Sequence, residues 1–246
     1  MEKVGYRFTT KEGCKATVIE YKNGRNVKIV FDDYGIEKVT RWDNCLSGHI
    51  KNPMFPTHFG VGYIGIGNYK PKDHKDAYKK WECMIARCYD KRENKKNYNT
   101  YKDCIVCDEW HNFQNFAEWY YNNKKDDNSI IWDLDKDILA KGNKVYSPEY
   151  CALIPHELNN VMTKRDAKRG QCFIGVCLTK NGKYQSQVNQ DGKQKYLGVY
   201  DTEEEAFLVY KYEKEKIIKE TANKYRNFID DNVYNALIKY EVDIDD

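Results

Sequence analysis

The chain has 246 residues, and its 41 lysine and arginine residues against 38 aspartate and glutamate residues give a formal net charge of +3. This balance is only mildly basic and does not by itself predict a nucleic-acid partner, whereas the short apolar runs exclude a membrane span. The N-terminal residues lack the apolar stretch of a secretory signal, and nine cysteines fit free thiols in a reducing compartment, so we expect a cytoplasmic protein.

Residues 1–50 alternate short strand-like stretches with tight turns. The stretches cover residues 15–21, 26–31 and 37–42, and the turn sequences KNGR and DDYG separate them. Strands this short and closely spaced predict a small β-barrel of the SH3 or Tudor shape, which binds protein or nucleic acid or has a structural role only. The segment also resembles a module that accompanies phage DNA-binding proteins.

The central segment, residues 76–162, follows a predicted linker over residues 51–75 that holds most of the prolines. Two stretches in it, 76–90 and 108–123, carry apolar side chains at helical spacing, so each predicts a helix with one buried face. The two predicted faces consist of Tyr78, Trp81, Met84, Ile85 and Cys88, and of Trp110, Phe113, Phe116, Ala117 and Tyr120.

Four cysteines of this segment have the spacing of a zinc site. Cys104 and Cys107 would supply one half, and Cys83 and Cys88 the other. The second pair lies five residues apart on a predicted helix, a spacing that does not place both thiols on one face. Buried free thiols are commoner, so structural zinc is not expected.

The end of the central segment concentrates polar groups that suit metal chemistry. Asp133, Asp135 and Asp137 end an apolar run, and after a turn and a second apolar run Asn159 and Asn160 stand at a predicted helix start. The simpler interpretation is that the three aspartates are strand-end and turn residues that fix a hairpin.

Residues 81–160 resemble a group of phage proteins related to HNH endonucleases. The shared motifs are W-x-x-M-x-x-RCY at 81–89, VCDEW-x-x-F-x-x-F at 106–116, LDK at 134–136 and YSPExC at 146–151. The resemblance implies a central HNH-like domain with a ββα unit, and a protein that works in the cytoplasm of the host cell.

Members of that family place metal ligands on a strand carboxylate and a helix Asn or His, beside a His base that a middle Asn orients. Carried onto this chain, the resemblance makes Asp135 the carboxylate and Asn159 or Asn160 the helix ligand of a divalent cation, Mg²⁺ or Mn²⁺. Lys136 takes the position of the base, and Tyr150 takes the middle position. A lysine with its ordinary pKa is cationic at neutral pH and a poor base, so the implied nuclease site is eroded or variant.

Three neighbouring residues complete the expected site. Asp133 or Asp137 would be a further oxygen donor to the cation. His156 lies one helical turn before the asparagines and would replace the base if the helix points it inward. The candidate catalytic residues are therefore Asp135, Lys136 and His156, and the candidate metal ligands are Asp135, Asp137, Asn159 and Asn160.

The last segment, residues 171–246, follows a predicted basic linker at 163–170. Stretches at 172–180, 182–190 and 193–202 read as strands joined by turns at Asn-Gly and Asp-Gly, which are strong hairpin signals. The stretch 202–225 then predicts a helix, which Thr202 and Glu205 begin with a capping-box pattern. We expect a three-stranded sheet with this helix across it, and a helical tail after it.

This segment is similar to the AP2 DNA-binding domain. The matching residues are Gly175-Val176, Gly182-Lys183-Tyr184, Tyr196-Leu197-Gly198 and Thr202 to Ala206. The resemblance implies that the sheet lies in a major groove of double-stranded DNA. Unlike the family, residues 172–200 contain no arginine, so bidentate reading of guanine is not expected and affinity should be modest.

The second predicted strand places polar side chains on one face, because side chains alternate with a period of two. This face holds Lys183 for phosphate and the amides of Gln185, Gln187 and Asn189 for base edges. Thr179, Gln194 and Tyr196 fall at positions that the AP2 family uses for DNA contact.

The sequence therefore predicts an α+β protein: an SH3/Tudor-like β-barrel, an HNH-like domain and an AP2-like sheet plus helix. The leading hypothesis is a phage-type DNA-binding protein with an eroded or variant metal-dependent nuclease site. One alternative is an active HNH-type endonuclease of homing or restriction character. Another is a phage-encoded interaction protein that inhibits a host defence system, with a host protein as its partner.

Overall fold

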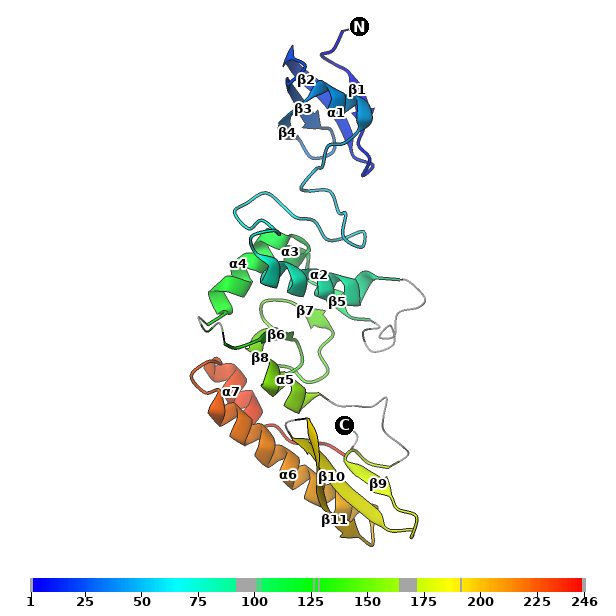
Figure 1. Cartoon of the computed structure of the whole chain (residues 1–246), viewed down its shortest axis with the longest axis vertical. Coiled ribbons are helices and arrows are strands. Elements are labelled where there is room, and N and C mark those ends of the chain that lie inside the picture. Colours follow the sequence, from blue (N-terminus) through cyan, green and yellow to red (C-terminus); the bar gives the residue numbers. More distant parts are fainter. Residues whose placement is uncertain are drawn as a thin grey trace. The chain divides into compact units, whose positions relative to one another are not determined.

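The computed structural model describes residues 2–91, 101, 103–125, 127, 129–163, 172–190 and 192–244 (Figure 1). The chain is α+β, as predicted, and separates into two compact units, Met1–Tyr121 and Asn122–Asp246, which we describe one at a time. The predicted basic linker 163–170 lies outside the described residues except for Thr163, and so does Asp191 of the predicted Asp-Gly turn. None of the described helices is long and apolar enough to cross a membrane. The predicted segment boundaries stay predictions.

An antiparallel sheet opens the first unit. Within the described residues its strands run in the order β1 (Arg7–Thr9), β2 (Lys15–Asn23), β3 (Asn26–Phe31) and β4 (Ile36–Thr40). Alternate side chains of β2 and β3 turn inward, and Cys45 of helix α1 (Trp42–Ser47) joins their core. Among the described strands β1 and β4 do not pair, so this is an open sheet and not the closed barrel that the strand pattern predicted. Its buried core consists of Cys14, Ala16, Val18, Val27, Ile29, Phe31, Cys45 and Ile50.

The rest of the first unit is helical, with α2 (Lys75–Tyr89), the short β5 (Ile105–Val106), α3 (Asp108–His111) and α4 (Phe113–Asn123). The predicted helix 76–90 is confirmed as α2, and the two apolar faces meet, since the Trp81 indole N–H donates to the Trp110 carbonyl oxygen at 2.7 Å. The predicted helix 108–123 is in fact two helices. The chain breaks at Asn112 because Tyr63 runs alongside, accepting from the N–H of Phe113 and donating to the carbonyl of His111, each at 2.9 Å.

The buried Gln114 holds the loop of residues 64–69 against α4. Its amide nitrogen donates to the carbonyls of Ile64 and Tyr69, at 3.0 and 2.9 Å, and its amide oxygen accepts from the Tyr69 N–H at 2.9 Å. The Gln114 amide therefore fixes the connection between the sheet and the helices, and its own polar atoms are all hydrogen-bonded.

The second unit begins with a hairpin-like pair of strands and a helix. Strand β6 (Trp132–Asp135) pairs antiparallel with β8 (Ala152–Pro155), β7 (Val145–Tyr146) lies in the connection between them, and α5 (His156–Met162) follows β8 directly. Ile154 of β8 and Leu158 of α5 are buried against the helices α6 (Glu203–Lys224) and α7 (Asp231–Ile238). The ββα arrangement expected from the sequence is present.

The remainder of the second unit is a sheet backed by α6. The described strands β9 (Val176–Leu178), β10 (Tyr184–Gln190) and β11 (Lys193–Tyr200) form an antiparallel sheet with β10 in the middle. In Figure 1 the helix α6, in orange, lies along these yellow strands. The predicted capping box is confirmed, since Glu205 N–H donates to the Thr202 hydroxyl at 3.2 Å and Thr202 N–H donates to the Glu205 carboxylate at 3.3 Å.

Candidate functional site

The ββα unit brings three polar side chains together. Asp133 lies in β6 opposite Ile154 of β8. Helix α5 begins at His156, whose N–H donates to the carbonyl of Ile131 at 2.8 Å, so the helix start is fixed beside β6. His156 and Asn159 are three residues apart in α5 and therefore lie on the same face of the helix.

Asp133, His156 and Asn159 form what we name the Asp133 cluster. Nδ1 of His156 lies 2.6 Å from Oδ2 of Asp133, and the Asn159 amide donates to the same oxygen at 3.0 Å. The Asp133 side chain is 16% exposed, whereas that of His156 is 52% exposed. A neutral imidazole that donates its Nδ1 proton to a carboxylate keeps its lone pair on Nε2, so the exposed ring can accept a proton from a molecule in solution.

Asp135, the predicted metal-binding carboxylate, has a different environment. Its Oδ1 accepts from the backbone N–H groups of Asp137 and Ile138, each at 2.8 Å, so the side chain closes the turn after β6. Burial raises the pKa of the Asp135 carboxyl, and the two backbone hydrogen bonds partly oppose that rise. The hydrogen bonds thus join α5 to Asp133, whereas those of Asp135 lie within the turn after β6.

Lys136, at the predicted base position, fixes the loop that follows β6. The side chain is buried, and Nζ lies 2.8 Å from the carboxylate of Asp137 and donates to the Asn143 carbonyl at 2.7 Å. Asn143 completes the loop by donating to the carbonyls of Lys136 and Val145, at 2.9 and 2.7 Å. Lys136 is therefore part of the structure of the loop after β6, through one ion pair and one backbone hydrogen bond.

The predicted ligand set for a cation is divided among separate contacts. Asp135 closes a turn, Asp137 pairs with Lys136, Asn159 bonds to Asp133, and Asn160 is exposed. Across the residues with described positions, no three His, Cys, Asp or Glu side chains gather as a metal group. Asn159 faces Asp133 with its amide nitrogen, which donates a hydrogen bond, and not with the oxygen that a Mg²⁺ or Mn²⁺ ion would need.

The cysteines remain thiols in the described structure. Cys104 is buried, Cys83 is exposed, and Cys88 and Cys107 are partly buried. The expectation about structural zinc stays a prediction.

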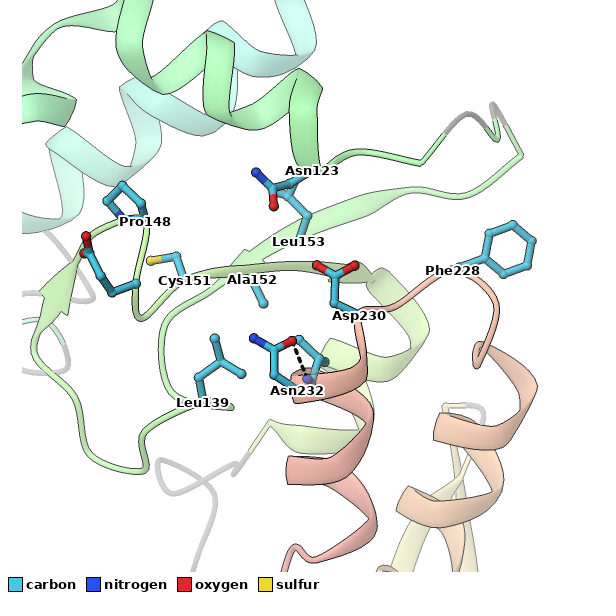
Figure 2. Close-up of a pocket in the computed structure, with 11 residues that line it drawn as sticks. Asn123, Leu139, Pro148, Cys151, Ala152, Leu153, Phe228, Asp230 and Asn232 are labelled. Atoms are coloured by element: carbon cyan, nitrogen blue, oxygen red, sulfur yellow. Dashed lines mark hydrogen bonds between the residues drawn. The ribbon is translucent and has the colours of Figure 1, made fainter.

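A shallow recess lies elsewhere in the second unit, between β8 and the start of α7 (Figure 2). Cys151 and Leu153 line one side, and Asp230 and Asn232 line the other. Glu149 adds a second carboxylate, and none of the Asp133 cluster lines the recess. Of its two carboxylates, that of Asp230 is paired with Lys125, whose ammonium lies 3.4 Å away.

The outer face of the C-terminal sheet carries the predicted amides. Gln185, Gln187 and Asn189 alternate with Ser186 and Val188, which are buried toward α6, and the Gln185 amide donates to the Gln187 amide oxygen at 3.2 Å. The prediction that the three amides share one face is confirmed. The register places Val199, Tyr196 and Gln194 of β11 opposite Gln185, Gln187 and Asn189 respectively. We name these six side chains the amide face.

Two predicted contact residues have intramolecular partners. The Lys183 ammonium lies 2.8 Å from the Asp201 carboxylate, and this hydrogen bond raises the pKa of Lys183. The Thr179 hydroxyl donates to the Lys183 carbonyl at 2.9 Å and accepts from its N–H at 3.2 Å, so it closes the turn between β9 and β10. Lys180 and Lys193, which sequence reasoning missed, are exposed near the two ends of β10, Lys180 in the turn before it and Lys193 at the start of β11. No described residue forms an ion pair with either of them. Their position beside hairpin turns was the signal available in the sequence.

Comparisons of the chain with models of protein families, with curated proteins and with solved structures find no match.

Proposed function

We propose that the protein binds double-stranded DNA through the amide face of its C-terminal sheet. The observation that carries this proposal is the alignment of Gln185, Gln187 and Asn189 on the side of β10 that faces away from α6. Amide groups can pair with base edges in the major groove, which is wide enough to admit a narrow β-sheet. The resemblance to the AP2 domain supports the same docking.

The lysines at the ends of β10 support the proposal electrostatically. Lys180 and Lys193 are exposed cations at opposite ends of the strand, where a sheet in a groove would meet the two phosphate backbones. Phosphate contacts of this kind supply affinity without sequence preference. Because the sheet contains no arginine, we expect sequence preference to come from the amides and from Tyr196.

Replacing Tyr196 by alanine is expected to weaken duplex binding about fivefold or more, because the contact of a large aromatic ring with a base is lost from the centre of the amide face. Tyr196 is 62% exposed and lies opposite Gln187. The matched control is Tyr212→Ala, since Tyr212 is 71% exposed on helix α6, and its loss should leave the affinity within about twofold. Fluorescence anisotropy with a labelled duplex at low salt measures both. Equal affinities of the two variants would refute the amide face.

Replacing Lys193 by alanine should reduce the slope of log affinity against log salt concentration by about one, because one phosphate contact is lost. Lys183→Ala should reduce the slope less, since Asp201 already compensates the Lys183 charge. The measurement is a salt titration of duplex binding. If the wild-type protein has no duplex affinity even at low salt, DNA binding is refuted and the protein-interaction alternative takes its place.

A second candidate function, hydrolysis of a phosphodiester, is favoured by the Asp133 cluster. Asp133 orients the His156 ring so that Nε2 can take a proton from water, and it stabilises the imidazolium that results. A divalent cation bound at the Asp133 carboxylate would supply charge stabilisation to the attacked phosphate. Asn159 could join it only by turning its amide oxygen toward the ion, because its nitrogen now donates to Asp133. The resemblance to HNH endonucleases implies the same class of reaction, but with Asp135 in place of Asp133 as the carboxylate.

A further inference from the structure

Three aromatic side chains of the N-terminal sheet form an open box. Tyr6 precedes β1, Tyr21 lies in β2 and Trp42 begins α1. The Trp42 ring lies 5.2 Å from the Tyr6 ring and 5.9 Å from the Tyr21 ring, the latter at an interplanar angle of 87°. All three are only half-buried and pack against the core of the sheet. Aromatic rings carry negative π faces, to which a cation beside them is attracted.

The side chain of Lys3 lies against two of these rings, those of Tyr21 and Trp42. Its ammonium lies 4.0 Å from the centre of the Tyr21 ring and 5.4 Å from that of Trp42, and it donates to the Tyr21 hydroxyl at 2.7 Å. Among the described residues no carboxylate lies within ion-pair distance of Lys3, so the rings and one hydroxyl are its counterpart. These distances are those of a cation–π site.

The segment that carries Lys3 is attached so that it can leave the box without disturbing the sheet. A turn folds this segment back on the sheet, and in this turn the Tyr6 N–H donates to the Lys3 carbonyl at 3.4 Å. Gly5, with φ of +83°, supplies the left-handed backbone conformation that the turn needs. The sheet is engaged only from Gly5 onward, where the Gly5 N–H donates to the Val18 carbonyl at 2.8 Å. Val4 is 52% exposed, so the segment before Gly5 gains little from packing.

We propose that Tyr21 and Trp42, with Tyr6 packed beside Trp42, form a binding site for the alkylammonium group of a lysine side chain from a partner protein. Lys3 stands in for that group in the free chain. The π faces of the rings attract a positive charge, and the position of Lys3 shows that a lysine ammonium fits against them. Self-occupancy lowers the apparent affinity for an incoming lysine by the fraction of molecules in which the box is open. The site is independent of the proposed DNA-binding face.

The test compares Lys3→Ala with Lys22→Ala as a matched control, because Lys22 is a surface lysine of the same sheet that pairs with Glu20. The full-length proteins are titrated with Nα-acetyl-lysine methylamide at constant ionic strength, and the indole N–H signal of Trp42 is followed by NMR. A Trp42→Phe variant assigns that signal. Lys3→Ala is expected to bind the probe about fivefold more tightly than the wild type, because a self-occupying cation of ordinary cation–π strength has been removed.

Lys22→Ala is expected to bind as the wild type does. The proposal is overturned if Lys3→Ala and Lys22→Ala have the same dissociation constant, or if the probe leaves the Trp42 signal of Lys3→Ala unmoved. A parallel titration with tetramethylammonium, a weakly hydrated cation without a hydrogen-bond donor, measures the ring contribution alone. No response to tetramethylammonium would refute the cation–π basis of the site.

Discussion

Replacing Asp133 by asparagine is expected to reduce nicking of supercoiled plasmid by about 100-fold or more, the usual contribution of a positioned general base. The reason is that Oδ2 of Asp133 is the partner of the His156 ring at 2.6 Å, and a neutral amide cannot stabilise the imidazolium that forms when His156 takes a proton. Asp135→Asn is the matched control. An asparagine there still offers a side-chain oxygen to the N–H groups of Asp137 and Ile138, so the turn and the activity should survive.

Nicking would be measured with Mg²⁺ or Mn²⁺, and duplex affinity would be measured on the same variants. His156→Ala should match Asp133→Asn in activity, and both should bind DNA as the wild type does, since neither residue lies on the amide face. If Asp135→Asn loses nicking while Asp133→Asn retains it, the catalytic carboxylate is Asp135 and the assignment to Asp133 is refuted. If the wild-type protein does not nick with either metal, hydrolysis is refuted and DNA binding stands alone.

The sequence pattern alone does not distinguish the environments of Asp133 and Asp135. Both residues lie in β6, two positions apart, so the period of a strand puts them on the same face. The motif match points to Asp135, and our proposal uses Asp133 instead, because the turn that follows β6 captures Asp135 with two backbone N–H groups. That capture depends on the conformation of a loop, and loop conformation is not encoded in hydrophobic spacing.

Local patterns, by contrast, predicted much of the fold. The apolar spacing of Trp81 to Ile85 gave the buried face of α2, and Thr202 with Glu205 gave the start of α6, since each signal lies within one or two helical turns. The hairpin turns set the register of the C-terminal sheet, and with it the composition of the amide face. The break at Asn112 was missed because it depends on Tyr63, which lies far away in the sequence.

The open N-terminal sheet was missed for a related reason. Strand length and spacing predict how many strands pair in sequence order, but closure requires contact between the first strand and the last. Nothing in the pattern of β1 and β4 encodes that contact, and the helix α1 instead contributes Cys45 to the core. The aromatic box follows from the same arrangement, because Trp42 reaches Tyr6 and Tyr21 only through α1.

Replacing Gly175 by alanine is expected to destabilise the C-terminal sheet by about 3 kcal/mol or more, the usual cost of overpacking combined with left-handed backbone strain. Gly175 has φ of +77°, and a Cβ there would lie 2.0 Å from Cδ2 of the buried Tyr210 ring. Gly182→Ala is the control. Its φ of +73° is nearly the same, but no atom lies within 4 Å of the added Cβ, so only the backbone strain of about 1 kcal/mol is expected. Urea unfolding followed by circular dichroism measures the difference, and equal midpoints would refute the steric argument.

The same substitution connects the fold of this sheet to its proposed function. The Gly175 carbonyl accepts from the N–H of Gln187 at 2.9 Å. Gly175, which lies close to the Tyr210 ring, therefore also positions Gln187 at the centre of the amide face. An alanine that pushes the chain away from Tyr210 would displace Gln187 with it. Gly175→Ala should therefore lose duplex affinity even under conditions in which it remains folded, whereas Gly182→Ala should retain it. Retained affinity in a folded Gly175→Ala protein would mean that DNA binding does not depend on the position of Gln187, and the amide face would lose its central contact.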